Sequence, residues 1–455
     1  MNDAAVTAKP SELAPLPSFA EATRLWLRVG LLGFGGPSAQ IALMHRFLVD
    51  ERRWIGEAQF LHALNYCMLL PGPEAQQLAI YVGWLLHGTR GGLVAGTLFV
   101  LPGFLVILAL STLYAYLHAV PLVAALFFGI KAAVLALVVE ALLRIGRRIL
   151  KGKGPVVLAV AAFLAIFVLG LPFPLIVLGA AVVGWLGARL LPAHFPPIQG
   201  HGGKDEDGHD GWRTAPHASV AWALRAAGTC LVLWWLPILA IVVGLGSAHV
   251  LTAVGLFFSK LAVVTFGGAY AVLAYMAQAA VETHGWLRPG EMLDGLGLAE
   301  TTPGPLILVT SFVGYLAAFR LPEPFPPWLA GILGAALTAW VTFVPCFLWI
   351  FLGAPFIERL RHLAPLAAAL SGITAAIVGV IANLALWFAL HFWFRVFATL
   401  PVAGLHLELP VPGSIDPAAV LLSALAMLAL LRFGLGLVPV LAGSAVLGAL
   451  YKLAL

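Results

Sequence analysis

A long internal repeat is the feature that most constrains how this chain can fold. LLGFGGPSAQIALM at 31–44 matches VVTFGGAYAVLAYM at 263–276, and the Gly-Gly pairs of the two segments lie 232 positions apart. The same offset places Pro-Gly-Pro at 71–73 on a second Pro-Gly-Pro at 303–305. Chance similarity between apolar helices scatters Leu and Val matches and does not align such tripeptides. The sequence therefore predicts two copies of one structural unit.

The amino-acid composition indicates which class of protein the two units form. Of the 455 residues, 62% are hydrophobic and 10% are charged, and the mean hydropathy is +1.00. Soluble domains carry about 45–50% apolar and about 25% charged residues. The composition therefore excludes an ordinary soluble enzyme, a disordered chain and a nucleic-acid binder.

Motifs that carry enzymatic chemistry are missing from the sequence. HExxH, GxSxG and the phosphate-binding GxxxxGK[ST] do not occur, so we expect neither an enzyme nor an ATP-driven pump. The three cysteines lie in apolar runs and follow no disulfide or zinc pattern. We expect no metal and no cofactor.

The apolar runs have the length of membrane-spanning helices, which need about 20 mainly apolar residues. About thirteen such elements are expected on this basis, six in each repeat and an unmatched one between them. They lie near 22–44, 57–88, 92–117, 121–143, 155–170, 172–191, 218–245, 250–276, 291–319, 328–352, 364–392, 417–431 and 434–453. Strand alternation is absent, so the predicted fold class is an all-α polytopic membrane protein.

The chain divides into five regions, of which the first lacks the apolar core of a signal peptide. They are a polar N-terminal tail at 1–18, the first repeat at 19–191, a hydrophilic linker at 192–217, a central connecting helix at 218–245 and the second repeat at 250–455. Histidines in the linker could bind a metal, but their irregular spacing is more typical of a solvated segment.

Basic residues indicate how the two repeats are oriented. RIGRRILKGK at 144–153 has five cations and no acid, which places it in the cytoplasm by the positive-inside rule. The corresponding loop of the second repeat, at 393–416, has one cation and two acids. Six crossings in each repeat and one central helix then give inverted repeats. The element 57–88 leaves an alternative open, because a re-entrant hairpin there would make the repeats parallel.

Each Pro-Gly-Pro lies inside a long apolar element. Proline removes a backbone donor and glycine loosens the helix, so each element is expected to split into two half-helices. Free N–H groups at the start of the second half-helix would suit an anion near the membrane midplane. A kink needed only for packing is the alternative. The candidate substrate-binding residues are Pro71, Gly72, Pro73, Pro303, Gly304 and Pro305.

Two glycine pairs, Gly35-Gly36 and Gly267-Gly268, lie inside the first element of each repeat. Glycine there allows either close helix approach or an unwound turn, so packing and ligand contact both stay open. Uncharged hydrogen-bonding residues beside the tripeptides complete the candidate binding set, namely Gln76, Thr301 and Thr302.

Arg28 and Lys260 occupy the same repeat position, seven residues before each glycine pair. Charges inside apolar runs are functional-site candidates. Two related cations that converge on a central site would suit a dianion. Snorkelling of these long side chains toward an interface is the alternative.

Four further charged residues could take part in transport. Glu74 follows the first tripeptide and Glu300 precedes the second, and a desolvated carboxylate can carry a proton. Glu74 could instead complement the dipole of a helix N-terminus. Lys131 and Glu140 are secondary candidates because their repeat mates are uncharged, and Glu140 could simply pair with Arg144.

Several of these segments together resemble the chromate ion transporter family, in its long two-domain form. The resemblance rests on GFGGP at 33–37, PGPEAQQLAIYVGW at 71–84, LPGF at 101–104, TFGG at 265–268 and PGP at 303–305. It implies a bacterial inner-membrane protein with thirteen helices in antiparallel halves, which exports chromate under the proton motive force and gives chromate resistance. Leu306 and Leu308 replace Glu74 and Gln76, so we expect the first repeat to hold more of the polar contacts.

Two other functions stay open at this point. Chromate is a tetrahedral dianion close in shape to sulfate, so the chain could be a general oxyanion carrier. A non-transporting membrane scaffold or sensor is the other alternative, although a scaffold does not need costly polar groups at the midplane. The expected partners are chromate or sulfate, protons and the lipid bilayer, without nucleic acid, and a homodimer is open.

Overall fold

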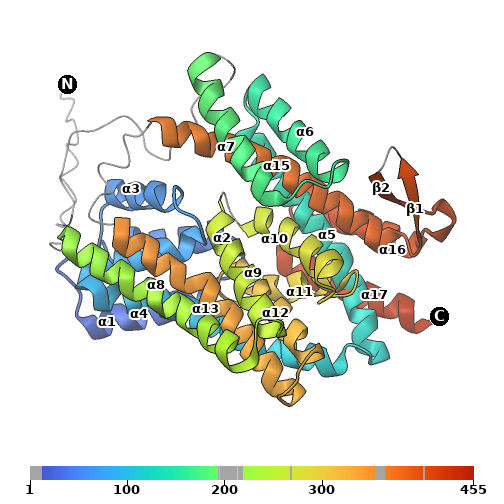
Figure 1. The fold of residues 1–455 in the computed structure, drawn as a ribbon, viewed down its shortest axis with the longest axis horizontal. Helices are drawn as coiled ribbons and strands as arrows, with labels where there is room; N and C mark the ends of the chain where they lie inside the picture. Colours follow the sequence, from blue (N-terminus) through green and yellow to red (C-terminus); the bar gives the residue numbers. More distant parts are fainter. Residues whose placement is uncertain are drawn as a thin grey trace, which may run out of the picture.

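The structure is a computed structural model, and it describes residues 13–192, 194, 213, 219–266, 269–353, 364–402 and 405–454. Helices dominate the described residues (Figure 1). Seven of these helices are long and apolar enough to cross a membrane. They are α4 (Glu74–Leu117), α5 (Pro121–Ile149), α7 (Phe173–Leu190), α8 (Val220–Leu245), α13 (Pro327–Gly353), α15 (Ala364–Trp393) and α17 (Leu437–Ala454).

Shorter elements complete each half of the chain. In the first half they are α1 (Phe19–Leu32), α2 (Gly36–His45), η1 (Arg46–Glu51), α3 (Glu57–Cys67) and α6 (Lys153–Phe167). In the second half they are α9 (Val250–Val264), α10 (Ala269–Gln278), η2 (Ala279–Thr283), α11 (Glu291–Glu300), η3 (Leu306–Leu308), α12 (Val309–Arg320), α16 (Pro417–Met427) and η6 (Leu428–Arg432). Both halves therefore run through the same order of elements, with α8 between them. Each expected apolar element corresponds to one or two of these helices, and thirteen crossings stay a prediction.

The first apolar element of each half is interrupted near its glycine pair. Gly35 and Gly36 have φ of +87° and +75°, a backbone conformation that L side chains rarely adopt. Helix α1 therefore ends before this pair and α2 begins at Gly36. The unwound turn, one of the two alternatives for these glycines, is what the first half contains. Gly267 and Gly268 lie outside the described residues, as do residues 1–12 and most of the linker.

Helix α4 joins two of the expected elements across a sharp kink. His87 and Gly88 have non-helical backbone angles, and the φ of Gly88 is +60°. The chain then folds back so closely that a Cβ at Gly83 would collide with Gly91. In the second half a loop at 321–326 separates the corresponding helices α12 and α13. Glycine thus permits in the first half a turn that the second half makes with extra residues.

A β-hairpin lies between α15 and α16, and it corrects the prediction that strand alternation is absent. Strands β1 (Phe397–Val402) and β2 (Leu405–Pro410) pair antiparallel, and a short 3₁₀ turn, η5 (Pro412–Ser414), follows. The sequence LHLELP of β2 alternates leucine with polar residues, which is the period of a strand. The alternation is too short to stand out among the neighbouring apolar helices.

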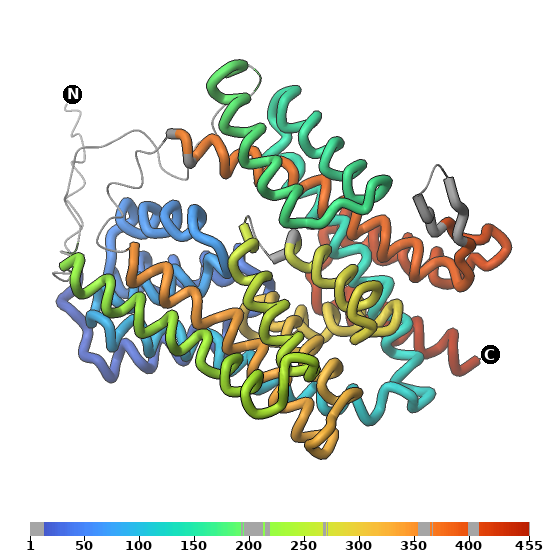
Figure 2. The backbone as a smooth tube through the Cα atoms, in the orientation of Figure 1, coloured from blue at the N-terminus to red at the C-terminus, as the bar shows by residue number. Residues whose placement is uncertain are grey.

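The long helices assemble into two groups (Figures 1 and 2). In one group, α1, α8, α9 and α12 pack around α4 and α13. In the other, α6 and α7 pack against α15 while α16 and α17 pack against α5. Close approach depends on small residues, since a Cβ at Gly129 would collide with Ser444 and one at its counterpart Gly372 with Ala180. Each group therefore contains helices of both halves, which are intertwined.

Arg213, from the hydrophilic linker, is anchored on the first half. Its guanidinium donates to the carbonyl oxygens of Ala14, at 2.5 Å, and of Trp54. Its backbone exchanges two hydrogen bonds with the buried side chain of Gln59.

Arg320 occupies the equivalent position in the second half. This guanidinium donates to the carbonyl oxygen of Trp286 at 2.7 Å and to the carboxylate of Glu291. The 232-residue offset relates Trp286 to Trp54 and Glu291 to Gln59. The first half therefore takes its arginine from the linker, and the second takes it from the end of α12.

We expect Arg213→Ala to lower the thermal unfolding midpoint of the purified protein by about 2–4 °C. The substitution removes the donor for two carbonyl oxygens, and each lost partner costs about 1–3 kcal/mol where the group is buried. Scanning fluorimetry in detergent measures the shift. Arg90→Ala, at an exposed site, is the matched control, and equal midpoints for the two variants would contradict the anchoring role.

Candidate functional site

Each Pro-Gly-Pro meets the interrupted first element of the opposite half. The backbone N–H of Gly304 donates to the carbonyl oxygen of Gly33 at 2.9 Å, and that of Gly72 donates to the carbonyl oxygen of Thr265 at 2.8 Å. The 232-residue offset relates Gly72 to Gly304 and Gly33 to Thr265. The same hydrogen bond therefore forms twice, so the two helix breaks of each half cross those of the other.

The tripeptides create these breaks through local backbone geometry. Gly72 and Gly304 have φ of +110° and +95°, which favour glycine. Pro73 and Pro305 are extended and stand directly before a helix start. Helix α4 begins at Glu74, and η3, which runs on into α12, begins at Leu306. The helices are thus broken at both tripeptides, as the sequence predicts.

A small, partly open space, the crossing space, lies where the breaks cross. Its volume is about 10 Å³, close to what one water molecule needs. The first turns of α2, α4 and the helix formed by η3 and α12 all contribute to its wall, so three helix N-termini, where N–H groups lack intrahelical partners, lie beside it. The lining residues are Pro37, Gln40, Gly72, Pro73, Glu74, Ala75, Thr265, Pro305, Leu306 and Ile307.

Gln40 links the two halves at this point. Its fully buried side chain donates from Nε2 to the carbonyl oxygens of Gly33, at 3.0 Å, and Gly304, at 2.5 Å. Sequence reasoning missed this residue. The available signal is a polar side chain inside the apolar element 22–44, but its repeat mate is Val272, so the repeat does not point to it.

The remaining glutamines of this region serve the first tripeptide and its helix. Gln77 is fully buried and donates from Nε2 to the carbonyl oxygen of Pro71 at 2.7 Å. Gln76, a candidate binding residue, reaches the carbonyl oxygen of Gly96 at 3.5 Å and does not line the space. The side-chain oxygen of Gln76, Oε1, is buried and has no hydrogen-bond partner among the described residues.

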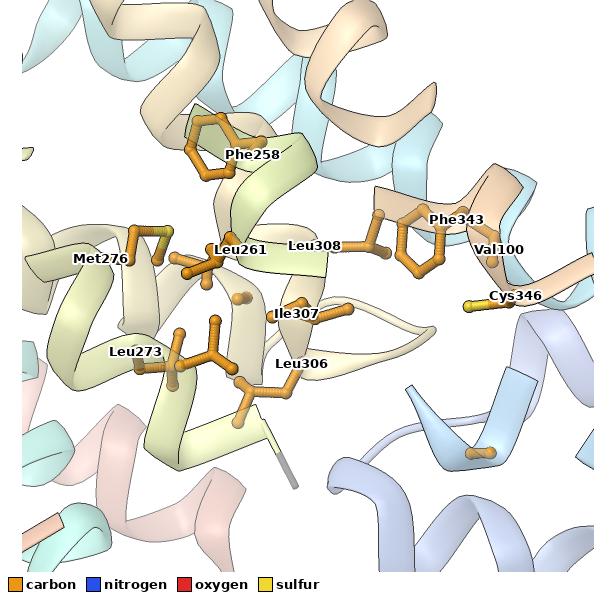
Figure 3. Close-up of a cluster of buried hydrophobic side chains, with 14 of the residues drawn as sticks. Val100, Phe258, Leu261, Leu273, Met276, Leu306, Ile307, Leu308, Phe343 and Cys346 are labelled. Carbon is orange, nitrogen blue, oxygen red and sulfur yellow. The ribbon is translucent and has the colours of Figure 1, made fainter. Parts of the chain in front are cut away.

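The second tripeptide leads into an apolar environment. Figure 3 shows Leu306, Ile307 and Leu308 among buried hydrophobic side chains that include Phe258 and Phe343. The corresponding positions of the first half carry Glu74 and Gln76. Around the crossing, polar side chains therefore come mainly from the first half.

The two candidate carboxylates differ in position. Glu74 lines the crossing space at the start of α4. Glu300 is 8% exposed at the end of α11 and accepts a hydrogen bond from the hydroxyl of Tyr270 at 2.9 Å. It is not part of the lining. The hydroxyls of Thr301 and Thr302 donate back to carbonyl oxygens of α11 and so are engaged within their own turn.

Arg28 and Lys260 are not part of the lining of the crossing space. Both side chains are exposed, and each lies over an aromatic ring of its own half. The guanidinium of Arg28 is 4.8 Å from the ring centre of Phe47, and the ammonium of Lys260 is 5.7 Å from that of Tyr275. The two cations thus keep their related positions without converging at the crossing in this conformation.

The secondary candidates on α5 have different partners. Lys131 lies 3.3 Å from the carboxylate of Asp294, which sequence reasoning missed. Glu140 lies 3.6 Å from Arg144, one turn along the same helix, which is the simple pairing that the sequence allows for it. Within the described ranges, no cluster of three His, Cys, Asp or Glu residues is placed to hold a metal ion.

The sequence matches one family model in both halves. The model, described as chromate transporter, covers residues 20–185 and 252–449. A chromate transport protein of Pseudomonas aeruginosa is 34% identical over 382 residues, covering 82% of this chain and 81% of that protein.

Further relatives span a similar share of the chain. A chromate transport protein of Cupriavidus metallidurans is 28% identical over 369 residues, covering 81% of this chain and 82% of that protein. An uncharacterized transporter of Methanocaldococcus jannaschii is 24% identical over 375 residues, covering 82% of this chain and 85% of that protein. No solved structure matches the chain.

Proposed function

The chain belongs to the chromate transporter family and is a multi-pass membrane protein, and from that premise we propose that it exports chromate from the cytoplasm as a secondary active transporter. The membrane would be the inner membrane of a bacterium, and export would give chromate resistance. The observation that carries the proposal is the crossing of the two helix breaks, with three helix N-termini beside the crossing space.

A crossing of this kind suits a tetrahedral dianion. Helix N-termini bind anions through free N–H groups and the positive end of the helix dipole. Broken helices near the membrane midplane are where secondary transporters hold their substrates. Chromate has four oxygen atoms that can accept hydrogen bonds from several directions, and the three helix N-termini would supply donors to them.

The crossing space has room for about one water molecule, so chromate enters only after the breaks move apart. Alternating access around this point requires that the site open to one side of the membrane and then to the other. Two halves with the same order of elements and opposite orientation would provide both states. We therefore retain inverted repeats in the proposal.

Helix lengths favour one broken crossing at the element 57–88. Helix α3 has 11 residues and rises about 16 Å, and the first part of α4, up to the kink at His87, rises about 21 Å. Neither reaches the roughly 30 Å of a hydrocarbon core alone. The two together are long enough, so α3 and this part of α4 would form one crossing interrupted at Pro-Gly-Pro.

Charged residues would act while the substrate approaches and while the site opens to one side of the membrane. Arg28 and Lys260, exposed on related helices, would attract the dianion from the solvent. Glu74 lines the crossing space, where its negative charge and a bound dianion would repel each other in a medium of low dielectric constant. Proton occupancy of Glu74 and anion occupancy of the site would therefore be linked, and Glu300 is the second candidate for a coupling proton.

Chromate uptake into inverted membrane vesicles, with and without a proton gradient, tests the proposed function. Gradient-dependent accumulation that excess sulfate barely reduces would support a chromate exporter. Equal movement of sulfate would make the chain a general oxyanion carrier. Absence of flux for both ions, with the protein inserted in the vesicles, would contradict transport and would favour a non-transporting scaffold or sensor.

We expect the combined variant Arg28→Gln and Lys260→Gln to export chromate about tenfold more slowly at low ionic strength, with a smaller effect in high salt, because exposed charges are screened. Arg24→Gln combined with Arg225→Gln, at exposed sites of α1 and α8, is the matched control for net charge. Unchanged export by the Arg28 and Lys260 variant, at normal expression, would show that these cations do not serve the substrate.

A further inference from the structure

A buried ionic cluster joins three helices away from the crossing. Asp294 of α11 is 3% exposed. Its Oδ2 accepts a hydrogen bond from the hydroxyl of Tyr114 on α4 at 2.8 Å and lies 3.3 Å from the ammonium of Lys131 on α5. Its Oδ1 is buried and has no hydrogen-bond partner among the described residues. The carboxylate therefore has one free oxygen in a low-dielectric environment, where unpaired polar atoms are costly.

A second acid on the same helix is fully satisfied. Both carboxylate oxygens of Glu291 accept hydrogen bonds from Arg320, at 2.7 Å and 2.9 Å. Oε2 also accepts the backbone N–H of Arg288 at 2.7 Å. This bidentate geometry is that of a structural ion pair. Asp294 and Glu291 lie one helical turn apart, so the contrast between them reflects a difference in role.

The cluster lies where the two helix groups meet. Helix α11 packs on α5 and also contacts α4 and α12, and α10 packs on α15 and also contacts α9. These two helices therefore connect the group around α4 and α13 with the group around α5 and α15. Among the described residues, the counterparts α2 and α3 have no comparable packing against α5 and α15. The ends of α11 and α3 also differ in exposure. Glu300, at the end of α11, is 8% exposed, and its repeat mate Met68, after the end of α3, is 36% exposed. Among the described residues, α11 is thus packed against the group around α5 and α15, while its counterpart α3 is not.

We propose that Asp294 binds the coupling proton of the transport cycle and that its ion pair with Lys131 holds the α11 side closed. A proton taken from the solution converts the Asp294 carboxylate to the neutral acid and ends the ion pair. The Lys131 side chain is 24% exposed, and its ammonium keeps its charge and turns to water. Helix α11 can then leave α5. This inference rests on the proposed function.

The surroundings of Asp294 allow such a step. Charged and titratable groups that face it are Lys131 from α5, Tyr114 from α4, and Glu291 with its partner Arg320 from α11 and α12. Helix α11 ends at Glu300, and the second Pro-Gly-Pro follows after Thr301 and Thr302. Its displacement would therefore move the wall of the substrate site and couple proton binding to access.

The charge-neutral double variant Lys131→Met with Asp294→Asn tests the proposal in proteoliposomes of the full chain. We expect chromate counterflow without a gradient to stay within twofold of the unmodified protein. Accumulation driven by a proton gradient should fall to the level seen without one. Glu291→Gln with Arg320→Met, on the same helix, is the matched control and should leave the gradient dependence intact.

A milder variant keeps the test decisive if the double variant does not fold. Tyr114→Phe removes one hydrogen bond from the ionised carboxylate with little change in packing. Because that bond favours the charged form, its loss should move the pH midpoint of gradient-driven transport upward by about half to one pH unit. An unmoved midpoint, or full gradient dependence in the double variant, would overturn the role of Asp294. Absence of gradient dependence in the unmodified protein would overturn proton coupling itself.

Discussion

Replacing Gly304 with alanine is expected to lower chromate transport by more than tenfold while the protein still inserts in the membrane. The φ of Gly304 is +95°, and left-handed backbone costs an L residue about 1–2 kcal/mol. A Cβ there would also press on Leu308 at 3.0 Å and on Gly103 at 3.4 Å. The substitution therefore displaces the N–H that donates to Gly33. Gly72→Ala should act in the same way on the bond to Thr265. Vesicle flux normalised to the amount of protein measures both effects.

Gly246→Ala is the matched control for this prediction. The φ of Gly246 is +92°, nearly that of Gly304, and a Cβ there would meet open space. Both positions have a positive φ that disfavours an L side chain, but only Gly304 lies at the crossing. We expect Gly246→Ala to transport within twofold of the unmodified protein. Equal losses in the two variants would mean that the crossing has no special part in transport.

Gln40→Leu should cause the second large effect, a fall in transport of more than tenfold with a lower thermal unfolding midpoint. The buried carbonyl oxygen of Gly304 loses its side-chain donor, and such an unsatisfied group costs about 1–3 kcal/mol. The carbonyl oxygen of Gly33 loses one of two donors and keeps the backbone N–H of Gly304. Because these carbonyls belong to opposite halves, their loss of a shared partner loosens the crossing itself. Flux assays and scanning fluorimetry on the same preparation measure the two effects.

Gln278→Leu provides the comparison for a glutamine outside the crossing. Its side chain donates to Glu282, one turn along the same segment, at an exposed position. We expect this variant to keep normal flux and a normal unfolding midpoint. Normal flux in Gln40→Leu would contradict the idea that Gln40 ties the two halves together at the substrate site.

Much of the helical framework could be predicted from the sequence. Long apolar runs reveal helices by length and composition alone, and proline and glycine in one register reveal the breaks at 71–73 and 303–305. Both signals are local, because they depend on backbone chemistry within a few residues. The hairpin at 397–410 escaped notice since its alternation covers one short strand.

Contacts between the halves could not be read in the same way. Gln40 is one neutral polar residue in an apolar run, and its importance comes from a carbonyl 264 positions away. Asp294 is similar, because near the start of α11 it resembles an acid that complements a helix dipole. Its partner Lys131 is a separate signal in the sequence, and nothing in the spacing pairs the two.

For Arg28 and Lys260, the sequence relates the two positions but does not define what their side chains contact. The repeat correctly relates their positions along α1 and α9. Spacing along one helix does not define which neighbour a side chain will face, since that depends on how helices from both halves pack. In the present conformation both cations are exposed, and their proposed role is therefore at the approach to the site.

Equilibrium binding of radiolabelled chromate to the purified protein tests the central claim most directly, since it separates the site from the transport cycle. The crossing of the two helix breaks predicts saturable binding that unlabelled chromate displaces. It further predicts unchanged affinity in Gly246→Ala and at least tenfold weaker binding in Gly304→Ala. Full affinity in a folded Gly304→Ala protein, or no saturable binding in the unmodified protein, would contradict a chromate site at the crossing.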